Sequence, residues 1–255
     1  IYLNGNPGAP AVEPFEDDRV TFKLAAVYDL NSTYSVYGQY AQGFRAPPFD
    51  DVNVGFTNLQ GGYITLPNSN LESETSDSFE LGLRGQGTRG FFSLAAYVNQ
   101  YENFIESLAT LGFNPLSGLI EFQATNRDRV EIRGIEFKGN FAVPGVNGLN
   151  AVTTLAYARG ENEVTGQPIN TVDPLRAVVG FAYQPSSTWN AQLVMTAVAG
   201  QDRVDSSGAV NRFFEPGGYA TVDLLGEYHF GEQARLNFGI FNLTDRRYWE
   251  WGDVV

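Results

Sequence analysis

The sequence contains no cysteine and a single histidine, which limits the chemistry that its 255 residues can carry. Without cysteine there is no disulfide framework and no thiolate metal site, and cysteine pairing gives no information about the cellular compartment. Basic residues are also scarce, and the formal net charge is −13. This charge argues against nucleic acid as a partner, because nucleic-acid binding relies on lysine and arginine to neutralise phosphates.

Long hydrophobic runs are missing too, since no stretch approaches the roughly 18 apolar residues of a transmembrane helix. This absence does not exclude a membrane, because a barrel strand crosses in about ten residues and only alternate side chains need to be apolar. Aromatic residues make up 14% of the chain and there are 28 glycines. Because aromatic residues favour strands and glycine favours turns, the composition predicts an all-β protein.

Apolar and polar residues alternate in one segment after another, which is the pattern of a half-buried strand. The first such segment places one apolar set on one face, with Thr21 and Lys23 opposite: Val20, Phe22, Leu24, Ala26 and Tyr28. The same period of two recurs in later segments that begin near Tyr34, Phe79, Phe92, Leu175, Trp189, Ala220 and Leu236. Between Ile132 and Ile135, beside Gly134, the apolar residues change from one alternate set of positions to the other, which predicts a β-bulge.

The predicted connections alternate between tight turns and long excursions. Turn-forming residues cluster near 30–32, 86–88, 144–146, 185–187 and 231–233. The long connections cover roughly 44–75, 105–118, 160–173 and 200–217. Outer-membrane barrels sort their loops in this way, with short periplasmic turns and long extracellular loops, whereas a soluble β-sandwich has no reason to do so. The pattern therefore predicts an antiparallel transmembrane β-barrel with about ten strands in this chain.

Two short motifs stand at the ends of the first long connection. Phe44-Arg45-Ala46-Pro47 matches the FRAP box of TonB-dependent haem and haemoglobin receptors, and Asn68-Ser69-Asn70-Leu71 approximates their NPNL box, with Ser69 in place of proline. The sequence resembles this family. Other phrases are similar to those found across TonB-dependent barrels generally: Asn126-Arg127, Arg133-Gly134-Ile135-Glu136-Phe137, Pro174-Leu175-Arg176 and Phe241-Asn242-Leu243-Thr244-Asp245-Arg246-Arg247-Tyr248.

The resemblance implies a 22-stranded receptor barrel with a plug in its lumen. Residues 1–255 would be part of that barrel, without the plug, the earlier strands and the last strand. The implied cargo is haem, taken free or from haemoglobin, and no catalytic cofactor is expected. The implied partners are the TonB complex, reached through the absent N-terminal region, the haem or haemoglobin, and the lipid of the bacterial outer membrane.

The loop between the two boxes often supplies a histidine ligand to iron in this family, but here it contains none. Tyr63 lies there between Gly62 and Ile64, and a tyrosinate oxygen can serve as an axial ligand to ferric haem. We therefore expect Tyr63 to bind the haem iron, with packing of a loop aromatic as the alternative. Arg45 could pair with a haem propionate or with a loop carboxylate such as Asp50 or Asp51.

Several further residues receive less specific interpretations. The only histidine, His229, precedes a tight turn and shares strand parity with Asp223 and Glu227, which predicts a lumenal position far from the cargo. The acids Asp50, Asp51, Glu72 and Glu74 are expected to be solvated, and Trp249 and Trp251 to belong to the membrane interface or a loop. No catalytic residue is expected.

Other functions remain open at this point. Within the same transporter class, a ferric siderophore or another cargo would use the same barrel. An outer-membrane protease of the omptin type has the right strand count, but its catalysis needs histidine at the extracellular rim, where the sequence offers none. A soluble β-sandwich or binding module is the third possibility.

Overall fold

The computed structural model describes residues 12–206 and 214–253, and most of their regular structure is β-strand. Ten strands follow one another as antiparallel neighbours in one sheet, in the order β1-β2-β5-β6-β7-β8-β9-β10-β11-β12. Their bounds are β1 Lys23–Asp29, β2 Tyr34–Arg45, β5 Glu74–Gly87, β6 Gly90–Asn114, β7 Leu119–Ala142, β8 Leu149–Asn162, β9 Arg176–Tyr183, β10 Trp189–Val198, β11 Tyr219–Phe230 and β12 Ala234–Ile240. The predicted all-β class and the ten sequential strands are confirmed.

Two short strands join the same sheet outside this path. They are β3 (Phe56–Asn58) and β4 (Tyr63–Leu66). β3 pairs with β4, and β4 also pairs with β7. One short helix, α1 (Phe49–Asn53), precedes them, and the 3-10 turn η1 (Trp251–Asp253) ends the described chain. Within the described ranges, neither helix has the length or apolar character required to cross a membrane.

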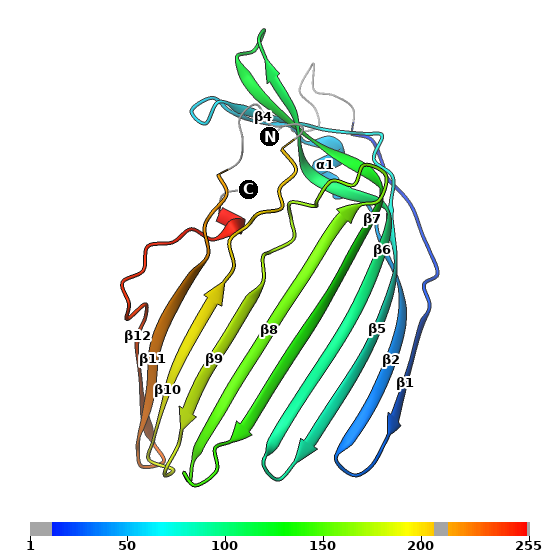
Figure 1. Cartoon of the computed structure of the whole chain (residues 1–255). Helices are drawn as coiled ribbons and strands as arrows, with labels where there is room; N and C mark the ends of the chain where they lie inside the picture. The colour runs from blue at the N-terminus through cyan, green and yellow to red at the C-terminus, as the bar shows by residue number, and fades with distance from the viewer. Residues whose placement is uncertain (1–11, 207–213, 254–255) are drawn as a thin grey trace.

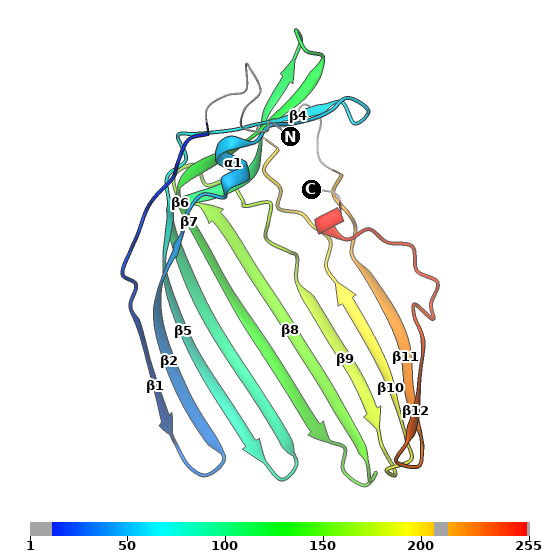
Figure 2. The same cartoon turned by 180° about the vertical axis from the view of Figure 1, so that it is seen from behind.

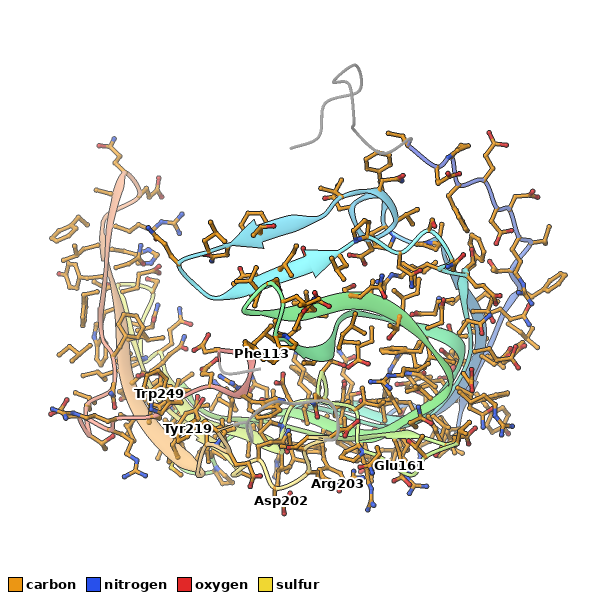
Figure 3. The ribbon with its side chains drawn as sticks, turned by 90° about the horizontal axis from the view of Figure 1, so that it is seen from above. Phe113, Glu161, Asp202, Arg203, Tyr219 and Trp249 are labelled. Atoms are coloured by element: carbon orange, nitrogen blue, oxygen red, sulfur yellow. The ribbon has the colours of Figure 1, made fainter. Side chains whose placement is uncertain are left out.

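The ten strands stand side by side with a common tilt, and the sheet curves around an open interior (Figures 1 and 3). Tight turns join the strands at one end, and the long connections gather at the other (Figure 2). We call these the short-turn end and the long-loop end. The sheet is open, because β1 and β12 are its two outermost strands and do not pair with each other in the described part of the chain.

The two faces of the sheet differ in chemistry, as the alternation predicts. One face carries exposed apolar side chains on almost every strand: Leu24, Leu81, Leu94, Ile135, Val179, Phe181, Leu193, Met195 and Phe238. Residues of the opposite parity contribute most of the lining of a hollow of about 740 Å³, whose polar members include Tyr37, Glu80, Tyr97, Glu136, Lys138 and Arg176. An apolar convex face and a polar concave face are the arrangement of a barrel wall around a wet lumen.

Two sequence-based expectations are wrong. Pairing of β7 with both neighbours is continuous through Gly134, so there is no bulge at that point. The apolar Ile132 faces the hollow instead, because Ile169 and Val172 of the following long connection approach it around Gly160. The stretch 105–118 is also not a long loop, because β6 continues through it to Asn114 and a tight turn at residues 115–118 leads into β7.

The soluble β-sandwich is not the fold of this chain. All strands of the described residues belong to a single sheet. A sandwich would place two sheets face to face around a dry core, whereas the exposed apolar residues and the polar hollow lie on opposite sides of one layer.

Candidate functional site

A small sheet crosses the opening at the long-loop end. β6 and β7 are 25 and 24 residues long, and their upper parts extend beyond the other strands (Figure 1). There β4 pairs in parallel with β7, from Tyr63 opposite Ile120 to Leu66 opposite Gln123. The result is a four-stranded layer in the order β3-β4-β7-β6, which we call the loop sheet. Figure 3 shows it lying over the space that the curved main sheet surrounds.

Irregularities in β6 accompany this extension. The register between β6 and β7 shifts between Glu106 and Ala109 and again between Thr110 and Gly112. At the second shift Gly112 adopts a φ of 110°, a conformation that side-chain-bearing residues rarely take. Bulges bend a strand and increase its local twist, so these two shifts account for the way the hairpin leaves the line of the main sheet.

The helix that follows the first motif box meets the second box beneath the loop sheet. The first box leads into α1, and Pro48 occupies the N-cap position of that helix. Val52 of α1 is 5% exposed and packs with Leu71 of the second box, which is 3% exposed, and with Ala124 of β7. We call these three residues the clasp. They form the apolar contact that fixes the start and the end of the first long connection to the same strand.

Asparagine side chains surround the clasp with hydrogen bonds. Asn68 donates its side-chain amide to the Ala124 carbonyl at 2.8 Å, and its backbone N–H donates to the Asp51 carbonyl at 2.8 Å. Asn126 accepts from the Glu72 N–H at 2.9 Å and donates to the Glu72 carbonyl at 3.0 Å. The asparagines of the second box and of the Asn126-Arg127 phrase therefore hold backbone groups in the first long connection and on β7.

Arg45 lies at the end of β2, where the ladder places it opposite Glu74. Its Nη1 is 3.6 Å from the Glu74 Oε2, and its side chain remains 45% exposed. Glu74 is a buried residue that also accepts a 2.8 Å hydrogen bond from the Ile105 N–H. The expectation that Glu74 is a solvated acid is therefore wrong, and Arg45 pairs with this carboxylate rather than with Asp50 or Asp51.

Tyr63 begins β4, after Gly62 at a φ of 72°. Its ring centroid lies 6.2 Å from that of Phe56 and 6.0 Å from that of Phe122, the latter in an edge-on contact. The ring is half-buried, and its hydroxyl has no hydrogen-bond partner within residues 12–206 and 214–253. The structure thus places Tyr63 in the loop sheet among aromatic neighbours, nearer in sequence to the second box than to the first.

His229 lies at the other end of the molecule. It is the penultimate residue of β11, just before the tight turn to β12. Its Nε2 contacts the Glu227 carboxylate on the same face of the strand. Its backbone N–H donates to the Thr188 carbonyl at 2.7 Å. The histidine therefore sits at the short-turn end, as the sequence predicts, and away from the loop sheet.

A second set of contacts at the long-loop end was not identified from the sequence. Trp251 of η1 is 4% exposed and donates its indole N–H to the Asn170 carbonyl at 2.6 Å. Arg203 lies 3.3 Å from the Glu161 carboxylate, and these two side chains are neighbours in Figure 3. Of the two tryptophans expected at the interface or in a loop, Trp251 is a buried loop anchor, whereas Trp249 is exposed.

Comparison with known proteins identifies this architecture. A family model described as TonB dependent receptor-like, beta-barrel matches residues 2–243. Among curated relatives, a probable hemoglobin and hemoglobin-haptoglobin-binding protein 4 of Haemophilus influenzae is 28% identical over 91% of this chain and 25% of its own length. The hemoglobin-haptoglobin utilization protein B of Neisseria meningitidis is 29% identical over 90% of this chain and 32% of its own length. The chain thus spans a quarter to a third of these relatives.

Solved structures show the same fold. The copper transporter OprC superposes with a TM-score of 0.75 at 22% identity, over 89% of this chain and 34% of that protein. The ferric enterobactin receptor PfeA of Pseudomonas aeruginosa superposes with a TM-score of 0.68 at 23% identity, over 89% of this chain and 35% of that protein. At this level of identity the likeness concerns the fold alone.

Proposed function

The chain belongs to the TonB-dependent receptor β-barrel family, and we propose that it forms part of an outer-membrane receptor that imports haem, free or from haemoglobin, with energy supplied through TonB. The observation that carries the choice of cargo is that relatives aligning with about nine-tenths of this chain are named for hemoglobin and haptoglobin. The motif pair that resembles haem receptors supports the same choice, and the clasp joins Leu71 of the second box to Val52, which follows the first box on α1.

The location in the outer membrane follows from the two faces of the main sheet. The exposed apolar side chains of the convex face would contact lipid, and the polar hollow would face the lumen. The short-turn end would then be periplasmic, and the long-loop end with the loop sheet would be extracellular. In this orientation the loop sheet is the first part of the chain that an arriving cargo meets.

Within this receptor, Tyr63 is our candidate for one axial ligand of ferric haem. A phenolate is a known haem ligand, and no hydrogen bond from residues 12–206 or 214–253 occupies the Tyr63 oxygen. Arg45 has a different role in this proposal. Its pairing with the buried Glu74 braces the ends of β2 and β5, and its exposed part could meet a haem propionate only in addition to that pair.

Growth on defined iron sources tests this function. The full-length receptor would be produced in an iron-starved bacterium that has TonB but no haem receptor of its own, with haem, haemoglobin or ferric enterobactin as the only iron source. Haem import predicts growth on haem or haemoglobin that requires both the receptor and TonB. Growth on the ferric siderophore alone would assign the other cargo and overturn the proposal.

A matched pair of variants tests the ligand. Tyr63→Phe removes only the hydroxyl, and we expect the haem absorption spectrum of the purified full receptor to lose its tyrosinate signature. Tyr28→Phe is the control, because Tyr28 is an exposed residue of β1 near the short-turn end. An unchanged spectrum in Tyr63→Phe would remove the ligand assignment without affecting the growth test.

A further inference from the structure

The register of the loop sheet gathers aromatic side chains on one of its two faces. Residues that are directly opposite in neighbouring strands point to the same face. One row runs through Asn58, Tyr63, Ile120 and Phe113, and the adjacent row through Phe56, Thr65, Phe122 and Thr110. The ring contacts of Tyr63 with Phe56 and Phe122 agree with this placement. We call Phe56, Tyr63, Phe113, Ile120 and Phe122 the aromatic face.

This face is turned toward the interior of the receptor. Ile120, Phe122 and Ala124 are spaced two residues apart along β7, so their side chains lie on the same face of the strand. Ala124 packs against Val52 of α1. Both Figure 1 and Figure 2 draw α1 on the lower side of the loop sheet, toward the main sheet. The aromatic face is thus the underside of the loop sheet and looks into the opening that Figure 3 shows from above.

The aromatic face is not covered by the described residues. Phe56 is 56% exposed and Phe113 is 53% exposed, and Tyr63, Ile120 and Phe122 are half-buried. A contiguous group of exposed apolar side chains commonly marks a surface that a ligand or partner contacts. Four strands span three inter-strand spacings, about 14 Å, so the face offers a broad apolar surface.

We propose that the aromatic face is the stacking site for the porphyrin ring of the cargo, with Phe113 and Phe122 as its main contacts beside Tyr63. The inference rests on the proposed function and adds the residues that hold the macrocycle, as distinct from the atom that binds the iron. A flat tetrapyrrole fits because it is planar and apolar over most of its area, so aromatic edges and faces can contact it widely. The Tyr63 hydroxyl, which has no hydrogen-bond partner in the described part of the chain, could reach the centre of such a ring.

Metal-free protoporphyrin separates stacking from iron ligation. The purified full-length receptor would be titrated with ferric haem and with metal-free protoporphyrin, by absorption and by tryptophan quenching. Phe113→Ala and Phe122→Ala should together weaken both ligands by about tenfold or more, since each aromatic contact is worth a several-fold change in affinity. Tyr63→Phe should weaken haem more than metal-free protoporphyrin, because only the iron complex uses the phenol oxygen.

Leu111→Ala is the matched control for Phe113→Ala. Leu111 is on the same strand, is 51% exposed, and is the extra residue at the second register shift, outside the rows of the aromatic face. We expect this variant to bind both ligands as the unaltered receptor does. Phe113→Leu keeps an apolar side chain of similar size and should fall between the two, and heat-dependent migration on gels checks that every variant retains a folded barrel.

Each outcome has one meaning. If the unaltered receptor binds haem but the two phenylalanine variants bind both ligands normally, the stacking site is wrong and the proposed function stands. The same holds if the variants lose haemoglobin binding and keep protoporphyrin, which would make the face a protein contact. If the unaltered receptor binds neither haem nor haemoglobin, the proposed function fails and this inference fails with it.

Discussion

Truncation of Leu71 to alanine should release the first long connection from the main sheet. Leu71 is 3% exposed and is one of three apolar residues in the clasp, with Val52 on α1 and Ala124 on β7. Its removal leaves a cavity between three segments that are far apart in sequence. The surrounding hydrogen bonds, such as those of Asn68, join the same segments and cannot by themselves replace the lost apolar contact.

The expected size follows from the burial. A buried leucine replaced by alanine costs about 2–5 kcal/mol. The clasp joins a loop to an otherwise intact sheet, so this cost should fall on local opening of the connection rather than on unfolding of the whole barrel. Because each 1.4 kcal/mol changes an equilibrium tenfold, the opened population should rise by about 30-fold to several thousand-fold.

Hydrogen exchange of the full receptor in detergent measures this opening. The amides of Asn68 and Glu72, which donate to the Asp51 carbonyl and the Asn126 side chain, should exchange faster in Leu71→Ala by the stated factor. Amides in β8 should not change. Leu116→Ala is the control, because Leu116 is 96% exposed. Unchanged exchange at Asn68 and Glu72 in Leu71→Ala would refute the idea that the clasp holds the connection.

Three further perturbations follow from the same structure. Glu74→Ala should destabilise the junction of β5 and β6 by about 1–3 kcal/mol, because a buried N–H loses its acceptor, and Glu74→Gln should recover part of this in thermal melts. Leu193→Arg on the convex face should cost about 2–4 kcal/mol in refolding into lipid vesicles, while Gln192→Arg on the concave face should cost little. Trp251→Phe should loosen the connection around Asn170 by about 1 kcal/mol, visible as faster proteolysis there and nowhere on the main sheet.

The strands of the main sheet were predictable because one face is apolar and the other polar, so apolar and polar side chains alternate with a period of two along each strand. Leu193 and Met195 illustrate this, since both are exposed on the convex face, whereas Asn190 and Gln192, of the opposite parity, line a smaller hollow on the other face. The same reasoning failed where the period breaks for non-local reasons. Between Glu106 and Gly112 two register shifts disturb the alternation, so the sequence there predicts a loop where the structure has a long hairpin. Ile132 is apolar because a distant connection covers it, which no local pattern records.

The candidate site was predictable in position but not in construction. The two boxes marked the first long connection, yet their sequence does not indicate that Leu71 meets Ala124 or that Asn126 holds Glu72. These contacts depend on a strand more than 50 residues away in the chain. The aromatic face is equally hidden, because Tyr63 and Phe113 become neighbours of Ile120 only through the register of β4, β7 and β6.

Spin-label accessibility along β10 tests most directly whether one face of this sheet meets lipid and the other meets water. This segment contributes no cysteine of its own, so single cysteines placed in turn from Asn190 to Ala197 in the full receptor in lipid vesicles report individual positions. The account predicts that labels at 191, 193, 195 and 197 are relaxed by oxygen dissolved in lipid, and labels at 190, 192, 194 and 196 by a water-soluble nickel complex. Equal accessibility along the strand, or the opposite parity, would contradict it.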